Sequence, residues 1–195
     1  MLYRPDGKIF GMDDMTIATG TKADIMKAAQ QVVLRDGVAS LTLEAVAREA
    51  GRSKGGLLYH FPTKEALIQG LIADLVARFD AEVERRVALD PVAGPGRWLR
   101  AFLDATAEEE DTDYALGGGI FAAISQDLSL LEPIRMAYRR WQDRAVADGL
   151  DPIVATVVRI AADGLWLSDM FAFAPLADPT RRDVIAYLRS LASVP

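Results

Sequence analysis

The segment from Leu41 to Ala66 constrains the fold most, because it places two short helices on either side of a tight turn. It reads LTLEAVAREAGRSKGGLLYHFPTKEA. Thr42 stands at an N-cap position, and Val46 and Ala47 begin the narrow apolar stripe of a short helix packed on a neighbour. Gly51 follows as a residue that ends a helix in the left-handed conformation. The segment predicts a helix-turn-helix, whose second helix can enter the major groove of DNA.

The second helix of this motif has an unusual first turn. Ser53 caps it, and Thr63 caps the helix after it. Gly55 and Gly56 stand in the first turn, where each glycine costs roughly 0.5–1 kcal/mol relative to alanine. Two interpretations remain open. Either the glycines simply belong to a loosely formed turn, or they let the start of the helix approach a phosphate strand closely.

The run GRSKGGLLYHFPTKEAL, residues 51–67, resembles the TetR family of bacterial transcriptional regulators. The shared pattern is a small-residue turn, a Ser-Lys-Gly-like recognition helix, an aromatic pair, then Phe, two residues and Lys-Glu. The resemblance extends over residues 22–71, about a quarter of the chain. It implies an all-α fold of about nine helices. A three-helix DNA-binding domain would be followed by a helical bundle for ligand binding and dimerisation.

Two positions depart from the family pattern. Leu58 occupies the place of the usual phosphate-contacting Tyr, so that role passes to the neighbouring Tyr59 and His60. Arg52 stands where a small apolar residue usually packs, and its long side chain can reach outward to a phosphate. Hydroxyl, imidazole and ammonium donors suit phosphates and base edges. The residues predicted to contact DNA are Thr42, Arg52, Ser53, Lys54, Gly55, Gly56, Tyr59, His60 and Lys64.

The expected domains are residues 1–20, 21–68 and 69–195. The first has Gly, Asp and Pro punctuation and no helical period, which is typical of a tail. An arm that touches the minor groove is the functional alternative. Met12 and Met15 lie nearer to the expected start of the DNA-binding domain than Met1 does. The first helix is expected to open at or next to Thr21.

Charge separates the two main domains. The whole chain carries −6, which by itself argues against a nucleic-acid partner. Residues 1–68, however, hold nine Lys and Arg against eight Asp and Glu. The acidic excess therefore belongs to the remainder. DNA affinity should depend on a few placed donors and on dimerisation.

Residues 69–195 carry a helical pattern without convincing strand alternation. A long helix should run from Lys64 to about Asp90, with apolar residues spaced by four. Further helices are expected at 95–110, 114–127, 131–148, 152–173 and 180–191. The triplet Gly117-Gly118-Gly119 is a simple loop, or else a yielding point or a place of close helix packing beside a pocket.

Large apolar side chains at helical spacing have two interpretations in this domain, ordinary core or an apolar effector pocket between helices. The resemblance favours the pocket for the group. Asp163 and Asp169 interrupt an apolar helix; exposed or interface positions would explain them, whereas a buried one would favour a cationic or hydrogen-bonding ligand. The candidate ligand-binding residues are Trp98, Phe102, Phe121, Tyr138, Trp141, Trp166 and Met170.

The resemblance also implies a homodimer, because one short recognition helix reads few bases. A two-fold dimer presents two such helices roughly 34–36 Å apart on a quasi-palindromic operator. The last two helices are the candidates for the interface. The predicted interface residues are Val154, Val157, Val158, Ala161, Leu165, Val184, Ile185 and Leu188.

Several function classes have little support in the sequence. The chain has one His and no Cys, and it shows no metal-spaced ligands and no Gly-rich phosphate loop. No catalytic residue, metal site or cofactor is therefore predicted. No apolar run reaches the length of a membrane span, and a cytoplasmic location is expected. The expected function is a repressor that binds double-stranded operator DNA and is released by a small, largely apolar effector. The alternatives are an activator, a ligand-independent regulator or, from other classes, a helical enzyme or interaction bundle.

Overall fold

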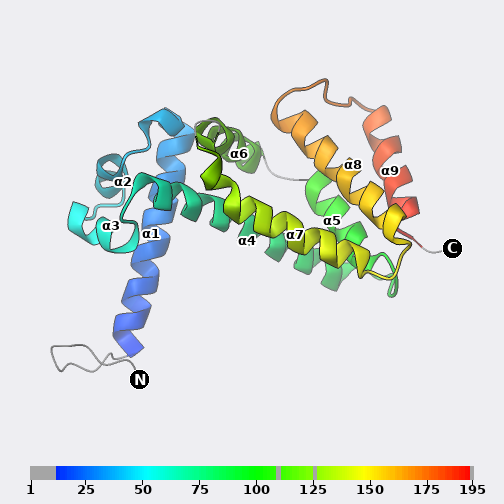
Figure 1. Ribbon diagram of the computed structural model, residues 1–195, viewed down its shortest axis with the longest axis horizontal. Coiled ribbons are helices and arrows are strands. Elements are labelled where there is room, and N and C mark those ends of the chain that lie inside the picture. Colours follow the sequence, from blue (N-terminus) through cyan, green and yellow to red (C-terminus); the bar gives the residue numbers. More distant parts are fainter. Residues whose placement is uncertain (1–11, 109–110, 125–126, 194–195) are drawn as a thin grey trace. The chain divides into compact units, whose positions relative to one another are not determined.

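The computed structural model describes residues 12–108, 111–124 and 127–193, and over these ranges its regular structure is all helical (Figure 1). Two compact units divide between Leu71 and Ile72. The helices are α1 (Met12–Asp36), η1 (Val38–Ser40), α2 (Leu43–Glu49), α3 (Lys54–His60), α4 (Lys64–Leu89), α5 (Arg97–Ala107), α6 (Asp111–Ile124), η2 (Leu128–Leu131), α7 (Glu132–Val146), α8 (Pro152–Met170) and α9 (Thr180–Leu191).

The first unit is a small helical domain built around one face of α1. Apolar residues that recur with the helical period bury one face of α1 together with the inner residues of α2, α3 and the start of α4. Gly37, at φ +78°, follows the last residue of α1. The buried apolar residues of this unit are Ile25, Met26, Ala28, Ala29, Val32, Val33, Leu41, Val46, Ala47, Leu57, Phe61, Leu67, Ile68 and Leu71.

The start of α1 differs from the sequence prediction. The helix begins at Met12, whereas the prediction placed residues up to 20 in a tail and the helix start near Thr21. Gly20 lies inside the helix, where its cost is only about 1 kcal/mol, so it does not act as a terminator. The remaining part of the predicted tail or groove-binding arm, residues 1–11, lies outside the described residues.

The second unit packs α5 against α8, with α7 and α9 beside them. Helix α5 is buried along most of its length, because nearly every residue from Trp98 to Thr106 is covered. Phe79, Phe102 and Trp141 meet edge to face, with ring centroids 5.1–5.6 Å apart. This aromatic cluster lies at one end of the cavity that the next subsection describes.

Three predictions for this unit are settled by the helix bounds. The Gly117-Gly118-Gly119 triplet lies inside α6, so the loop interpretation is wrong. Helix α4 ends at Leu89, next to the predicted limit at Asp90. The expected helix at 152–173 ends earlier, at Met170.

A buried arginine joins three chain segments at one corner of the second unit. Arg100 donates to the Asp90 carboxylate at 2.8 Å and to the carbonyl oxygens of Val92, Pro95 and Ala192 at 2.8–3.1 Å. The Arg100 side chain is only 3% exposed. A buried guanidinium is tolerated because every side of its fork finds an acceptor. Arg100 thus fixes the end of α4, the loop before α5 and the end of α9.

Gly96 allows this corner to close. Its φ of +79° is a left-handed conformation, and an added Cβ would lie 1.9 Å from the Ala192 carbonyl oxygen. Beside it, the Asp148 carboxylate accepts the backbone N–H groups of Trp98 and Leu99 at 3.2 and 2.9 Å. The unit therefore caps α5 with a side chain 49 or 50 residues away in sequence rather than with a local residue.

Replacing Arg100 with Ala should lower the free energy of unfolding by about 3–5 kcal/mol, because it leaves the Asp90 charge buried without its partner. Urea denaturation followed by circular dichroism measures this change. Arg139→Ala is the matched control. Arg139 pairs with Glu132 on the surface at 2.8 Å, so its removal should change stability by less than about 1 kcal/mol. Equal losses in the two variants would contradict the assignment of Arg100.

Candidate DNA-recognition face and ligand cavity

The recognition motif has the local geometry that its sequence predicts. The Thr42 hydroxyl accepts the Ala45 N–H at 3.1 Å, and the Ser53 hydroxyl accepts the Gly56 N–H at 3.1 Å. Thr63 caps α4 in the same way, at 3.0 Å from the Ala66 nitrogen. Gly51, at φ +61°, makes the turn. All three predicted caps and the predicted turn are confirmed.

The predicted DNA-contacting residues lie on the exposed surface of the first unit, except that His60 and Lys64 are partly buried. Tyr59 is 75% exposed and makes an edge contact with the His60 ring, whose centroid is 5.1 Å away. A Cβ added to Gly55 would meet nothing within 4 Å. The outer side of the first turn of α3 is therefore open, which a close approach by another backbone would require.

Two cations on this face are paired with acids of the same unit. Lys54 lies 2.5 Å from Glu44, and Arg52 lies 2.8 Å from Asp24. The hydrogen bond from Lys54 lowers the pKa of Glu44. Both pairs are exposed to solvent, so water and salt weaken them. Phosphate groups can therefore replace Glu44 as the partner of Lys54. In the same way, Arg52 can contact DNA by exchanging the Asp24 carboxylate for a phosphate.

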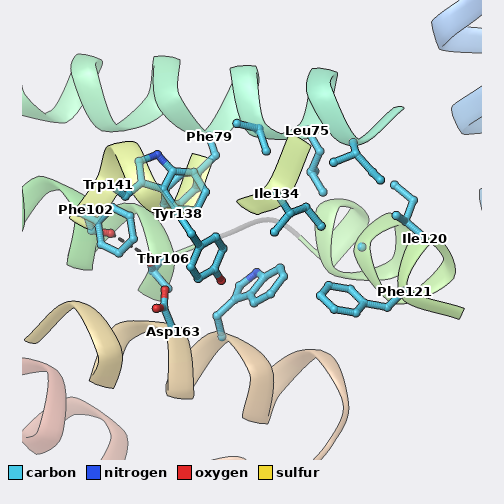
Figure 2. Close-up of a pocket in the computed structure, with 14 residues that line it drawn as sticks. Leu75, Phe79, Phe102, Thr106, Ile120, Phe121, Ile134, Tyr138, Trp141 and Asp163 are labelled. Atoms are coloured by element: carbon cyan, nitrogen blue, oxygen red, sulfur yellow. Dashed lines mark hydrogen bonds between the residues drawn. The ribbon is translucent and has the colours of Figure 1, made fainter. Parts of the chain in front are cut away.

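The second unit contains a cavity with an empty volume of about 680 Å³, which includes space open to solvent (Figure 2). Aromatic and branched aliphatic side chains from α4, α5, α6, α7 and α8 form its walls. Its size and lining are typical of sites for small organic molecules. The lining residues are Ile72, Leu75, Val76, Phe79, Phe102, Thr106, Gly117, Ile120, Phe121, Ile134, Tyr138, Trp141, Asp163 and Trp166.

Most of the predicted ligand-binding residues meet in this cavity. Phe102, Phe121, Tyr138, Trp141 and Trp166 line it, whereas Trp98 and Met170 do not. Trp98 is buried in the core beside Phe102. Met170 lies behind the wall, 3.6 Å from where a Cβ on Gly117 would stand.

The wall that α4 provides was not predicted. Ile72, Leu75, Val76 and Phe79 all line the cavity. The four-residue spacing of Leu75 and Phe79 was predicted as part of the long helix, without a role in ligand binding. The apolar spacing was thus visible in the sequence, but the sequence does not show which surface those residues face.

Two polar groups of the cavity wall are used within the protein. The Trp141 indole N–H donates to Asp80 on α4 at 2.6 Å. The Thr106 hydroxyl donates to the Phe102 carbonyl at 2.8 Å. These bonds fix both side chains and leave the N–H and O–H groups unavailable to a ligand.

Asp163 is the charged residue of the wall, and its position resolves an alternative left open by the sequence. It is partly buried, with its carboxylate 2.5 Å from Arg159 one helical turn earlier on α8. Burial raises the pKa of Asp163 to about 6, although Arg159 acts in the opposite direction. Asp169, by contrast, does not line the cavity and pairs with Arg181 at 2.7 Å.

The predicted dimer residues fall into three groups. Val158, Leu165 and Leu188 are buried within the second unit, so they cannot contact a partner. Val154, Ala161, Val184 and Ile185 pack against the same core, and only Val157 is exposed. Seven of the eight predicted residues therefore lie on sides of α8 and α9 that cover their own chain. The outer stripe of α8 consists of the exposed residues Ile153, Val157, Ile160 and Leu167.

Two further properties concern the described residues alone. They contain no group of three or more His, Cys, Asp or Glu placed to hold a metal ion. Among the same residues, no helix has the length and hydropathy that a membrane span requires.

The fold and its two sites define a class, a helix-turn-helix protein with a separate helical domain that encloses a cavity. Family models match both parts. Residues 25–71 match the bacterial regulatory proteins of the tetR family, and residues 96–193 match the tetracyclin repressor-like C-terminal domain. The chain belongs to the TetR family and is a DNA-binding transcriptional regulator, not an enzyme.

Curated relatives match only part of this chain. The HTH-type transcriptional regulator UidR of Escherichia coli (strain K12) is 36% identical over 78 residues, which are 37% of this chain and 40% of UidR. The HTH-type transcriptional regulator TtgR of Pseudomonas putida is 38% identical over 58 residues, 30% of this chain and 28% of TtgR. The chain thus matches less than half the length of either regulator.

Solved structures share the whole fold. A transcriptional regulator from Streptomyces coelicolor A3(2) superimposes with a TM-score of 0.71 at 18% identity, covering 89% of this chain and 99% of that one. The multidrug binding protein EbrR, in a complex with ethidium, gives a TM-score of 0.66 at 26% identity, with 89% and 99% coverage. A TetR family member from Streptomyces coelicolor A3 gives 0.67 at 25% identity, with 86% and 97% coverage.

The ion pair between Lys54 and Glu44 generates a prediction for DNA binding. Lys54→Ala should weaken binding to every duplex sequence and reduce the slope of log affinity against log salt by about one, because one phosphate contact is lost. Glu44→Gln should strengthen binding by up to about fivefold, because Lys54 no longer has to leave an acid. Fluorescence anisotropy with labelled duplexes over a salt series measures both.

Lys27→Ala provides the control, since Lys27 is an exposed cation of α1 outside the predicted contact set. It should leave the affinity and the salt slope nearly unchanged. If Lys54→Ala behaved like this control, the assignment of Lys54 to the recognition face would be wrong.

Proposed function

We propose that this regulator is a cytoplasmic repressor, which binds quasi-palindromic operator DNA as a homodimer and leaves it when a small organic ligand enters the cavity. The exposed face of α2 and α3 is the proposed DNA contact. The cavity in the second unit is the proposed effector site. The outer stripe of α8 is the proposed core of the dimer interface.

The observation that carries the proposal is that the single helix α4 contributes residues to both units. Its first residues, Lys64 to Leu71, belong to the DNA-binding unit and bury Leu67, Ile68 and Leu71. Its next two turns supply Ile72, Leu75, Val76 and Phe79 to the cavity wall. A ligand that displaces this wall acts directly on a helix that continues into the DNA-binding unit. A coupling of about 1–3 kcal/mol is the usual scale of such linkage.

A small organic effector has independent support. EbrR, which shares the fold at 26% identity, is a multidrug binding protein with a complex that contains ethidium. The largely apolar wall of the present cavity suits an effector of comparable chemistry. An activator would use the same two sites. Whether the DNA-bound protein lowers or raises transcription of its target gene distinguishes a repressor from an activator.

The dimer is supported by the apolar outer side of α8. Ile153, Val157, Ile160 and Leu167 recur at the spacing of one helix face, and Ile153 is 74% exposed. An exposed apolar stripe of this length is typical of a protein interface. A two-fold arrangement would present two recognition helices to two half-sites.

Selection of duplexes from a random DNA pool by the purified protein, at near-physiological salt, tests the function. The expected result is enrichment of a two-fold-symmetric site whose halves are about one helical turn, or a multiple of it, apart. The enriched duplex then serves as the probe for ligands that release it. Enrichment of asymmetric single half-sites would contradict the homodimeric mode.

Val157→Asp should shift the protein from dimer to monomer and weaken operator binding, because a charge would have to be buried in the interface. Analytical ultracentrifugation measures the shift. The fold should survive, since Val157 is 51% exposed in the single chain. Met136→Asp on α7 is the control, because Met136 has a similar exposure of 52% and lies outside the stripe. Retention of the dimer in Val157→Asp would contradict the proposed interface.

A further inference from the structure

The cavity carries one carboxylate in a wall that is otherwise uncharged. Asp163 is the only ionised side chain among the described residues that line it. One carboxylate oxygen accepts a hydrogen bond from Arg159, and the other has no partner among the described residues. The Thr106 and Trp141 donors are already engaged. The second Asp163 oxygen is therefore an acceptor to which none of the described wall residues donates.

The ion pair is oriented so that its negative end faces the cavity. Arg159 does not line the cavity. Its guanidinium is held behind Asp163 by Gln142, whose amide oxygen lies 2.5 Å from Nε, and it lies 5.9 Å from the centre of the Tyr138 ring. Gln142 is held in turn by the Thr156 hydroxyl at 2.8 Å. Asp163, and not Arg159, lines the cavity, so a ligand in the cavity meets the carboxylate first (Figure 2).

We propose that the effector is an organic cation, with its positive group bound to Asp163 and its apolar body among the aromatic rings of the cavity. This inference rests on the proposed effector site. A neutral apolar ligand would remove water from the second Asp163 oxygen and return no hydrogen bond, which is unfavourable. An anion would meet the carboxylate and no cation.

The walls around Asp163 favour the same ligand class. Six aromatic residues line the cavity, and the faces of aromatic rings attract cations. Shape and charge therefore select for one chemistry, a flat or bulky hydrophobic group with a single positive charge. The aromatic lining residues are Phe79, Phe102, Phe121, Tyr138, Trp141 and Trp166.

The same arrangement makes recognition depend on pH. Burial raises the pKa of Asp163 to about 6, so the carboxylate loses its charge as the pH falls through that value. Arg159 is the charged group that faces it from α8. Among the described residues that line the cavity, Asp163 is the only Asp, Glu, Lys, Arg or His, and Tyr138 is the other titratable residue. Affinity for a cation should therefore fall at acidic pH.

Three probes of nearly equal shape test the inference by isothermal titration calorimetry. They are 1-naphthylmethylamine, which is a cation at neutral pH, 1-naphthylmethanol, which is neutral, and 1-naphthoate, which is an anion. The amine should bind the full-length protein about tenfold or more tightly than the alcohol, because a charge-assisted hydrogen bond replaces an ordinary one. The naphthoate should bind more weakly than the alcohol.

Asp163→Asn should remove the preference for the amine and leave the affinity for the alcohol within about threefold, because the apolar walls are unchanged. Asp169→Asn is the matched control, since Asp169 lies on the same helix, is ion-paired and does not line the cavity. It should keep the preference. Thermal denaturation of both variants separates loss of the carboxylate from loss of the fold.

The pH series supplies a second readout. From about pH 8 to about pH 5 the amine stays protonated, and its affinity for the wild-type protein should fall while that of the alcohol stays constant. Asp163→Asn should show no such fall.

Equal binding of amine and alcohol by the wild-type protein would overturn the cation inference and leave the cavity as an effector site. Binding of none of the three probes would overturn both. Binding of the amine through Asp163 without release of operator DNA would sustain the inference and contradict the proposed release mechanism.

Discussion

The organisation of this regulator depends on one uninterrupted apolar stripe along α4. Leu67 and Leu71 are buried residues of the DNA-binding unit, and Leu75 and Phe79, which continue the same spacing, form cavity wall. No proline or glycine breaks the helix between Leu71 and Phe79. The backbone hydrogen bonds of α4 therefore connect a site that reads DNA to a site that can hold a ligand. Any displacement of Phe79 is a displacement of the same helix.

The DNA-binding half was predictable because its determinants are local. A hydroxyl three residues before a backbone N–H, as in Thr42 and Ser53, specifies a helix start without any distant contact. The same locality explains why Gly51 and the helix bounds around it agree with the sequence. Arg52 was less predictable, since its partner Asp24 lies 28 residues away on α1. Where a residue depends on a distant acceptor, spacing in the sequence carries no signal.

For the ligand-binding half, the sequence predicted which types of residue form the cavity, but not which side of each helix faces inward. Aromatic residues at helical spacing identified five members of the cavity, but Trp98 belongs to the core beside it. On α8, both sides of the helix are apolar, and periodicity does not tell which side meets α5. The buried Val158 and the exposed Val157 are adjacent and chemically identical, so only the tertiary structure separates them. For this reason most of the predicted interface residues of α8 lie on its inner side.

Asp163 shows how a functional site departs from the rules that shape the rest of the domain. A core selected for stability alone would place an apolar residue there, because a half-satisfied carboxylate in an aromatic wall is destabilising. The supporting residues Arg159 and Gln142 form three bonds of 2.5–2.8 Å behind it, which fix the carboxylate while leaving its cavity side open. Preorganised polar groups of this kind lower the cost of orienting a ligand. The geometry thus favours a site whose remaining acceptor is completed by what binds in the cavity, and a positively charged donor completes it most strongly.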